Sequence, residues 1–182
     1  GGVVVRSKGT HQAHVMLGTR ACAATAPQYL PLYLLNNILG GPAMNSRFNL
    51  ALRERRGLVY TVESNLTCYT DTGVWSVYFG CDPGDVNRCL RLVRGELKRL
   101  TDRPLSARQL AAAKRQLKGQ IVLSFDNPES VAIGMGKRFL HYGTTLTCSE
   151  LCARIDALTA DDLWQAAREV FNPDRLLTLK YK

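Results

Sequence analysis

The chain has 182 residues, of which 46% are hydrophobic and 21% are charged, and its formal net charge is +9. This composition is typical of a globular protein and the length allows one sizeable core, so we expect a single domain over residues 1–182. No stretch approaches the roughly 18 apolar residues of a membrane-spanning helix, and the N-terminal sequence GGVVVRSKGT lacks the apolar segment of a secretion signal.

The positive charge does not by itself predict a nucleic-acid-binding protein. Basic residues are scattered, and the densest stretch, RLVRGELKRL at 91–100, has the pattern of an amphipathic helix. The sequence has no RGG repeat, no lysine-arginine block and no basic strand with interleaved aromatic residues. We interpret the charge as a solvated helix face, with a docking face for an acidic partner as the alternative, and expect no nucleic acid as a partner.

Six cysteines are distributed along the chain without a C-x-x-C motif: Cys22, Cys68, Cys81, Cys89, Cys148 and Cys152. The last two have the spacing of one helix face rather than of a zinc-binding knuckle. We therefore predict buried, reduced thiols in an intracellular protein, which favours a cytoplasmic location.

The first half of the chain predicts strands, two helices and a hairpin. In chain order these are strands at 3–5 and 11–21, helices at 27–40 and 45–56, and two strands at 58–70 and 73–81. Gly40-Gly41 and Gly57 are typical C-terminal helix stops. The turn around Asp71-Thr72-Gly73 joins the last two strands as a hairpin.

The second half predicts helices and one closing strand. The helices lie at 83–100, 107–123, 128–141, near 149–155 and after Thr159, and the strand is LLTLKYK at 176–182. Asp82 before Pro83 is a predicted cap, Ser106 with Gln109 is a capping box, and Asn127 caps the next helix. Strands followed by helices, with one strand returning at the end, predict an α+β fold with a mostly antiparallel sheet and helices on one face.

No complete catalytic site is visible in the sequence. The three histidines, His11, His14 and His141, form neither H-E-x-x-H nor H-x-x-E-H. His11 and His14 would point to opposite faces of a strand, so they cannot easily bind one metal ion. G-x-S-x-G, P-loop and G-x-G-x-x-G motifs are missing, and Gly134 and Gly136 lie in a helical pattern that we interpret as close helix packing.

Residues 34–83 carry motifs that resemble the C-terminal half-domain of the pitrilysin/insulinase metallopeptidases. The motifs are a helix ending in L-G-G, an S-R-F sequence, the R-E-x-R-G-L-x-Y-x-V junction at 53–62, and a D-T-G hairpin leading to G-x-D-P. That family includes mitochondrial processing peptidases and bacterial processing-protease-like zinc enzymes. The order of the later elements agrees as well, so the resemblance covers nearly the whole chain.

The resemblance implies two homologous α+β halves that close like a clam around a peptide substrate. In such proteins the N-terminal half carries the zinc motif, and the C-terminal half offers an Arg and a Tyr seven positions apart, here Arg53 and Tyr60. We therefore expect no zinc ligand or other cofactor in this chain, and zinc in a homologous N-terminal partner domain on the same chain or on a partner subunit. The N-terminal Gly1 and the length agree with a C-terminal peptidase domain cut from a longer chain; a homodimer is a further expectation.

The predicted catalytic residues Arg53 and Tyr60 also have a physical rationale. Both are hydrogen-bond donors at pH 7, and donors aimed at a peptide carbonyl stabilise the negative charge that its oxygen gains during hydrolysis. The alternative is that Arg53 pairs with neighbours such as Glu54 or with solvent, and that Tyr60 is a core residue of its strand. Arg55 and Arg56 are explained by the negative end of the helix dipole. Glu63 is expected to be exposed rather than catalytic.

The function predicted from the sequence is therefore the substrate-chamber half of a zinc metalloendopeptidase, inactive as an isolated domain. Two alternatives stay open. One is a non-catalytic, structural core-type subunit of a processing-peptidase-like complex, and the other is a basic nucleic-acid-binding module.

Overall fold

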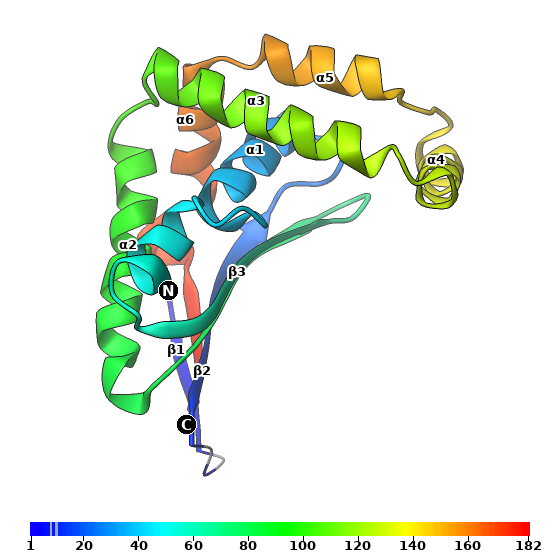
Figure 1. The fold of residues 1–182 in the computed structure, drawn as a ribbon. Coiled ribbons are helices and arrows are strands. Elements are labelled where there is room, and N and C mark those ends of the chain that lie inside the picture. Colours follow the sequence, from blue (N-terminus) through cyan, green and yellow to red (C-terminus); the bar gives the residue numbers. More distant parts are fainter. Residues whose placement is uncertain (8, 10) are drawn as a thin grey trace. The chain divides into compact units, whose positions relative to one another are not determined.

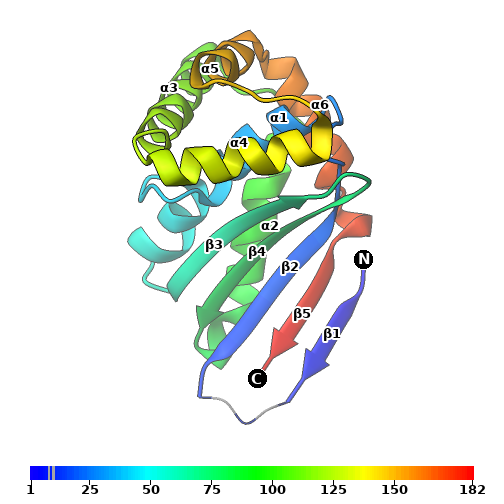
Figure 2. The ribbon, with the colours of Figure 1, turned by 90° about the vertical axis from the view of Figure 1, so that its right-hand side faces the viewer.

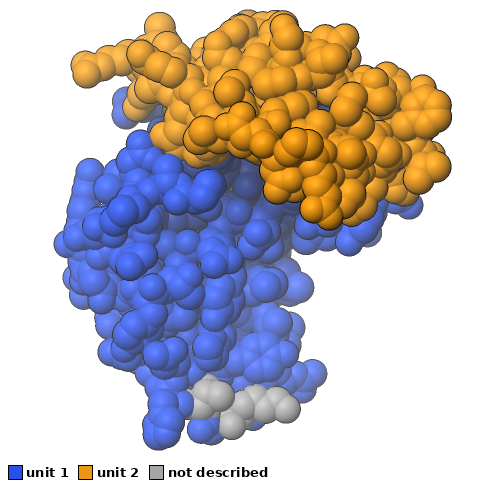
Figure 3. Space-filling model, turned by 45° about the vertical axis from the view of Figure 1, so that its right-hand side comes forward, with its two compact units in different colours: residues 1–104, 161–182 blue, residues 105–160 orange. Residues whose placement is uncertain are grey.

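The computed structural model describes residues 1–7, 9 and 11–182 and divides into two units. A five-stranded sheet forms the centre of unit 1. Unit 1 comprises residues 1–104 and 161–182, and unit 2 comprises residues 105–160 (Figure 3). The elements of unit 1 are β1 (Val3–Arg6), β2 (Ala13–Ala21), α1 (Tyr29–Gly40), η1 (Asn49–Glu54), β3 (Val59–Cys68), β4 (Gly73–Cys81), η2 (Pro83–Asp85), α2 (Val86–Asp102), α6 (Ala160–Val170), η3 (Pro173–Arg175) and β5 (Leu177–Tyr181). Unit 2 consists of α3 (Ala107–Ser124), α4 (Pro128–Tyr142) and α5 (Cys148–Ala157).

The sheet of unit 1 has the strand order β1-β5-β2-β4-β3 (Figure 2). β2 pairs with β4 and β5, and β3 pairs with β4, all antiparallel, whereas β1 and β5 are parallel. Helices α1, α2 and α6 cover one face of this sheet (Figure 1). The predicted α+β fold with a mostly antiparallel sheet and helices on one face is confirmed.

Alternating burial along the strands explains why the helices pack on a single face. In β2 the side chains of Val15 and Leu17 are fully buried, while Met16 between them is exposed on the other face. Such two-residue periodicity gives a strand one apolar side and one solvent side. On the covered side the ring of Trp75 meets that of Phe171 edge-on, with centroids 4.7 Å apart.

The end of α1 lies unusually close to β3. A Cβ placed on Gly40 would be 2.5 Å from the Cβ of Ser64 and 2.8 Å from its backbone nitrogen. One turn earlier, the side-chain oxygen of Asn36 accepts hydrogen bonds from Ser64 Oγ at 2.6 Å and from Trp75 Nε1 at 3.1 Å. The L-G-G sequence is therefore a packing requirement as well as a helix stop.

The three helices of unit 2 begin with side-chain caps. Ser106 and Gln109 form the predicted capping box of α3, and Asn127 caps α4 by accepting from the backbone N–H of Ser130. Thr147 and Glu150 form a second capping box at α5, which the sequence reading had not singled out. Two hydrogen bonds from Thr147, the one from its backbone N–H first, hold the pKa of Glu150 below its usual value.

The predicted close packing at Gly134 and Gly136 in α4 is wrong. A Cβ on either glycine would meet no atom within 4 Å among the residues that the structure describes. Helix α4 has no fully buried residue, and Leu140 is 85% exposed. No helix in the described part of the chain is long and apolar enough to span a membrane.

We expect Gly40→Ala to lower the free energy of unfolding by about 1–3 kcal/mol, because the added methyl group overlaps β3. Urea unfolding followed by circular dichroism measures this change. Gly95→Ala is the matched control, since Gly95 lies on α2 with open space around its Cβ position, and should stabilise the protein by about 0.5–1 kcal/mol. An unchanged or increased stability of Gly40→Ala would contradict the close packing.

Ser106→Ala is expected to lower the stability of α3 by about 1 kcal/mol, because the backbone N–H of Gln109 loses its acceptor, Ser106 Oγ. Hydrogen exchange of the first amides of α3, together with urea unfolding, provides the measurement. Ser130→Ala is the control, because it removes an exposed hydroxyl and keeps the backbone N–H that Asn127 caps. Equal exchange rates in the two variants would show that the capping box is not stabilising.

Candidate functional site

The junction between η1 and β3 places the two predicted site residues. The helix predicted at 45–56 is present but is wider than an α-helix, because η1 has π-type hydrogen bonding, and Arg55 N–H donates to the carbonyl of Leu50 at 3.3 Å. π-Type turns are rare and frequently occur at functional sites. Arg53 lies in the last turn of η1, and Tyr60 is the second residue of β3.

Gly57 ends η1 as predicted. Its φ of +59° is a left-handed conformation, and its N–H donates to the carbonyl of Arg53 at 2.7 Å. The guanidinium of Arg56 donates to the carbonyl of Ala51 at 2.8 Å, so this arginine caps the helix C-terminus. The positive charge of Arg56 is therefore explained by its hydrogen bond to the C-terminal end of η1.

The start of the same segment is anchored to α2. The guanidinium of Arg47 lies 3.9 Å from the carboxylate of Glu96, which also pairs with Arg99 at 2.6 Å. Burial lowers the pKa of Arg47, partly offset by the charge of Glu96. The S-R-F motif thus fixes the segment that leads to Arg53.

A β-bulge controls the direction of Tyr60. Val59 pairs with Cys81 and Thr61 pairs with Gly80, so Tyr60 is an extra residue on β3 without a counterpart on β4. Tyr60 is 60% exposed, which excludes the alternative that it is a core residue of its strand. Bulges of this kind redirect a side chain, and they are common beside active sites.

Arg53 and Tyr60 have separate and weak partners in this structure. Arg53 Nε lies 3.9 Å from Glu54 Oε1, with 52% of the Arg53 side chain exposed. The Tyr60 hydroxyl donates to Asp82 Oδ1 at 3.4 Å. Asp82 occupies the predicted N-cap position before Pro83, but its side chain makes no cap hydrogen bond. The helix begins instead with the short turn η2.

The uncovered face of the sheet also carries a histidine–tyrosine pair, which sequence reasoning missed. His14 Nδ1 and the Tyr78 hydroxyl are 2.7 Å apart, and their rings are stacked. Gly80 lies opposite His14 in the ladder, and a Cβ on it would be 3.7 Å from the Tyr78 hydroxyl. Glu63, opposite Tyr78, is exposed as expected.

The donor set of the described residues does not fit a zinc ion. Among residues 1–7, 9 and 11–182, no group of three or more His, Cys, Asp or Glu side chains lies close enough to hold a metal. His14 Nδ1 is already engaged by Tyr78, and His141 lies in the other unit. No chemical step can therefore be assigned to a metal on the described residues.

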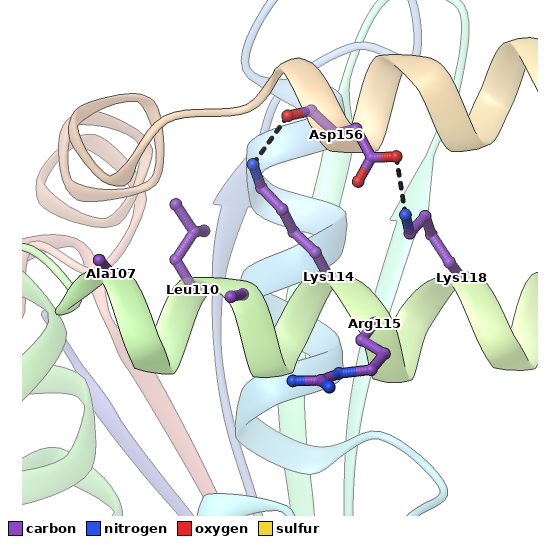
Figure 4. Close-up of a pocket in the computed structure, with 7 residues that line it drawn as sticks. Ala107, Leu110, Lys114, Arg115, Lys118 and Asp156 are labelled. Carbon is purple, nitrogen blue, oxygen red and sulfur yellow. Dashed lines mark hydrogen bonds and ion pairs between the residues drawn. The ribbon is translucent and has the colours of Figure 1, made fainter.

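Unit 2 contains a cavity of about 470 Å³ between α3 and α5. It is lined by Ala107, Leu110, Ala111, Lys114, Arg115, Lys118 and Asp156. Lys114 donates to the carbonyl of Asp156 at 2.9 Å and Lys118 to its carboxylate at 2.7 Å, while Arg115 points away from Asp156 (Figure 4). We interpret these contacts as ties between the two helices rather than as a ligand site.

The sequence has clear relatives among zinc proteases. It is 35% identical over 93% of its length to an uncharacterised zinc protease of Streptomyces coelicolor, and 30% identical over 97% to one of Bacillus subtilis. It is 31% identical over 82% of its length to the beta subunit of the mitochondrial-processing peptidase of Bos taurus. The chain spans only 37%, 43% and 32% of the lengths of these three relatives, respectively.

Solved structures share the fold. The peptidase M16 inactive domain from Pseudomonas fluorescens matches with a TM-score of 0.87 at 22% identity, over 99% of this chain and 43% of that one. A putative zinc protease from Bordetella pertussis matches with a TM-score of 0.74 at 19% identity, over 96% of both chains. The sequence profile of the peptidase M16 inactive domain covers residues 1–117, which include most of unit 1 and the first part of unit 2. With this match and these relatives, the chain belongs to the M16 family of zinc metallopeptidases, as an inactive C-terminal domain.

Proposed function

We propose that this chain forms the half of a peptidase chamber that lacks zinc, and that Arg53 and Tyr60 bind the substrate carbonyl during peptide hydrolysis. The observation that carries the proposal is the bulge that turns Tyr60 outward, beside the helix end that presents Arg53. Both side chains are largely exposed although they lie in well-packed elements. A buried scaffold that presents exposed donors is the arrangement expected of a binding surface.

The contacts that Arg53 and Tyr60 make in this structure are weak, so little free energy is lost when a substrate replaces them. The Arg53–Glu54 pair is solvent-exposed, and such pairs contribute about 0–1 kcal/mol. The hydrogen bond from Tyr60 to Asp82 is long at 3.4 Å, and its partners are exposed. A peptide carbonyl that gains negative charge would attract both donors more strongly than these contacts do.

The proposal places zinc in a partner half, because the described residues of this chain lack a suitable donor set. The relatives named zinc proteases are more than twice as long as this chain, which leaves room in them for a second domain of similar size. A bound zinc ion supplies Lewis-acid polarisation of the peptide carbonyl. In the proposal, this chain contributes the opposite wall, the orientation of the peptide and two hydrogen bonds to the carbonyl oxygen.

Tyr60→Phe, tested in the complete enzyme with its zinc-carrying half, is expected to lower kcat about 100- to 1,000-fold, as loss of one such donor commonly does. Zinc content and stability should stay the same, because the phenol is exposed. Tyr69→Phe is the matched control, since Tyr69 is a similarly exposed tyrosine beyond the other end of β3, and should keep full activity. Full activity of Tyr60→Phe would instead favour the structural core-type subunit.

The chain prepared without its partner half is expected to bind no stoichiometric zinc and to cleave no peptide. Metal analysis after dialysis and a fluorogenic peptide assay measure both properties. Addition of the zinc-carrying half should restore cleavage. One equivalent of bound zinc together with peptidase activity in the isolated chain would overturn the proposal that the active site needs both halves.

A further inference from the structure

The six cysteines form three spatial pairs, which the sequence spacing does not reveal. Electrostatic interactions pair Cys22 with Cys68, Cys81 with Cys89, and Cys148 with Cys152. The first pair links two strand ends in unit 1, the second links β4 to α2, and the third lies on successive turns of α5. The three pairs differ in accessibility and in geometry, which allows them to be compared within one molecule.

The backbone brings Cys22 and Cys68 together at one end of the sheet. Ala21 at the end of β2 and Cys68 at the end of β3 pair with the same residue, Gly73 of β4, from its two sides. The N–H of Ala24 then donates to the carbonyl of Tyr69 at 2.8 Å, so the chain leaving β2 runs beside the end of β3. Each of the two thiols contributes to the pKa of the other, as expected for neighbouring sulfur atoms.

Gly73 is what permits this approach. A Cβ at this position would be 3.2 Å from Cys68 Sγ and closer to the Cys22 carbonyl oxygen than real Cβ atoms come. A larger side chain at position 73 would clash with the backbone of Cys22 and crowd the Cys68 thiol. The glycine of the D-T-G turn therefore keeps these two groups close together.

We propose that Cys22 and Cys68 are a reversible dithiol–disulfide pair, which is oxidised to a disulfide when the protein is exposed to a low-molecular-weight disulfide. Both cysteines are half-buried and reachable, whereas Cys81 and Cys89 are both fully buried. Cys148 and Cys152 would have to bridge one turn of a regular helix. The proposal is independent of the role assigned to Arg53 and Tyr60.

The reaction is an exchange in two steps. The Cys22 thiolate attacks one sulfur of the small disulfide, forms a mixed disulfide and releases one small thiolate. Cys68 then loses its proton and attacks Cys22 Sγ, which forms the Cys22–Cys68 bond and releases the second small thiol. Two protein thiols are oxidised and one small disulfide is reduced to two thiols, so atoms and electrons balance.

The surroundings make this exchange slow at neutral pH. Burial raises the pKa of Cys22 above its usual value and raises the pKa of Cys68 to about 11. Because the thiolate is the attacking species, the rate should rise as pH increases from 7 toward these pKa values. A reducing buffer at neutral pH should keep the pair as thiols.

Formation of the Cys22–Cys68 disulfide would affect the segment that contains the candidate site. The residues between Cys22 and Cys68 include α1, η1 and the start of β3, and therefore both Arg53 and Tyr60. A cross-link between the ends of such a long loop lowers the conformational entropy of the unfolded chain, which stabilises the folded state. The disulfide should raise Tm by roughly 5–15 °C, as expected for a loop of this length in a protein of this size.

The test uses the full chain, with its partner half where the two occur together, equilibrated in glutathione buffers from reducing to oxidising at pH 8. Intact mass and peptide mapping after alkylation are expected to show a Cys22–Cys68 disulfide that forms before either other pair and reverses with excess thiol. The rise in Tm should be absent in Cys22→Ser and in Cys68→Ser. Cys148→Ser is the control and should keep it.

Mapping on the unsubstituted protein decides the question even if a variant folds poorly. A Cys148–Cys152 disulfide that forms first would overturn the proposal. So would mixed glutathione adducts at Cys22 that never resolve onto Cys68, or thiols at 22 and 68 that stay unmodified in the most oxidising buffer.

Discussion

The close approach of α1 to β3 is the contact on which the rest of unit 1 depends. Gly40 allows the helix end to touch the strand, and Asn36 connects the helix to Ser64 and Trp75 through one side-chain oxygen. Since α1 and β3 flank the segment 41–58, their contact sets the distance that this segment must span. The ion pair between Arg47 and Glu96 then holds the segment on α2, so the position of Arg53 follows from packing at a distance from it.

Much of the fold could be predicted because its signals are local. Gly57, the D-T-G turn, the Ser106 capping box and Asn127 act on their own neighbouring backbone, and each lies where its chemistry predicts. The pairing of β1 with β5 and the strand order could not be read in the same way, because they depend on contacts between distant parts of the chain. The family resemblance implied an α+β half-domain and an agreeing order of elements, but no strand order.

The candidate site was predictable in its residues but not in its geometry. The bulge at Tyr60 arises from the register with β4, and nothing in the sequence VYTV distinguishes it from a regular strand. Asp82 looked like a helix cap because it precedes a proline, yet its carboxylate accepts from the Tyr60 hydroxyl. The His14–Tyr78 contact likewise needs two strands in register, which local sequence patterns do not specify.

The parallel pairing of β1 with β5 has a consequence for how the protein is made. Val3 pairs with Thr178, so β1 can join the sheet only after β5, near the end of this chain, has been made. During synthesis, β1 would leave the ribosome long before its partner exists, with its backbone hydrogen-bonding groups unpaired. Contacts between residues so far apart slow folding. Completion of the sheet edge is therefore a late event, and a nascent chain that stalls before β5 would present an unpaired apolar strand to chaperones.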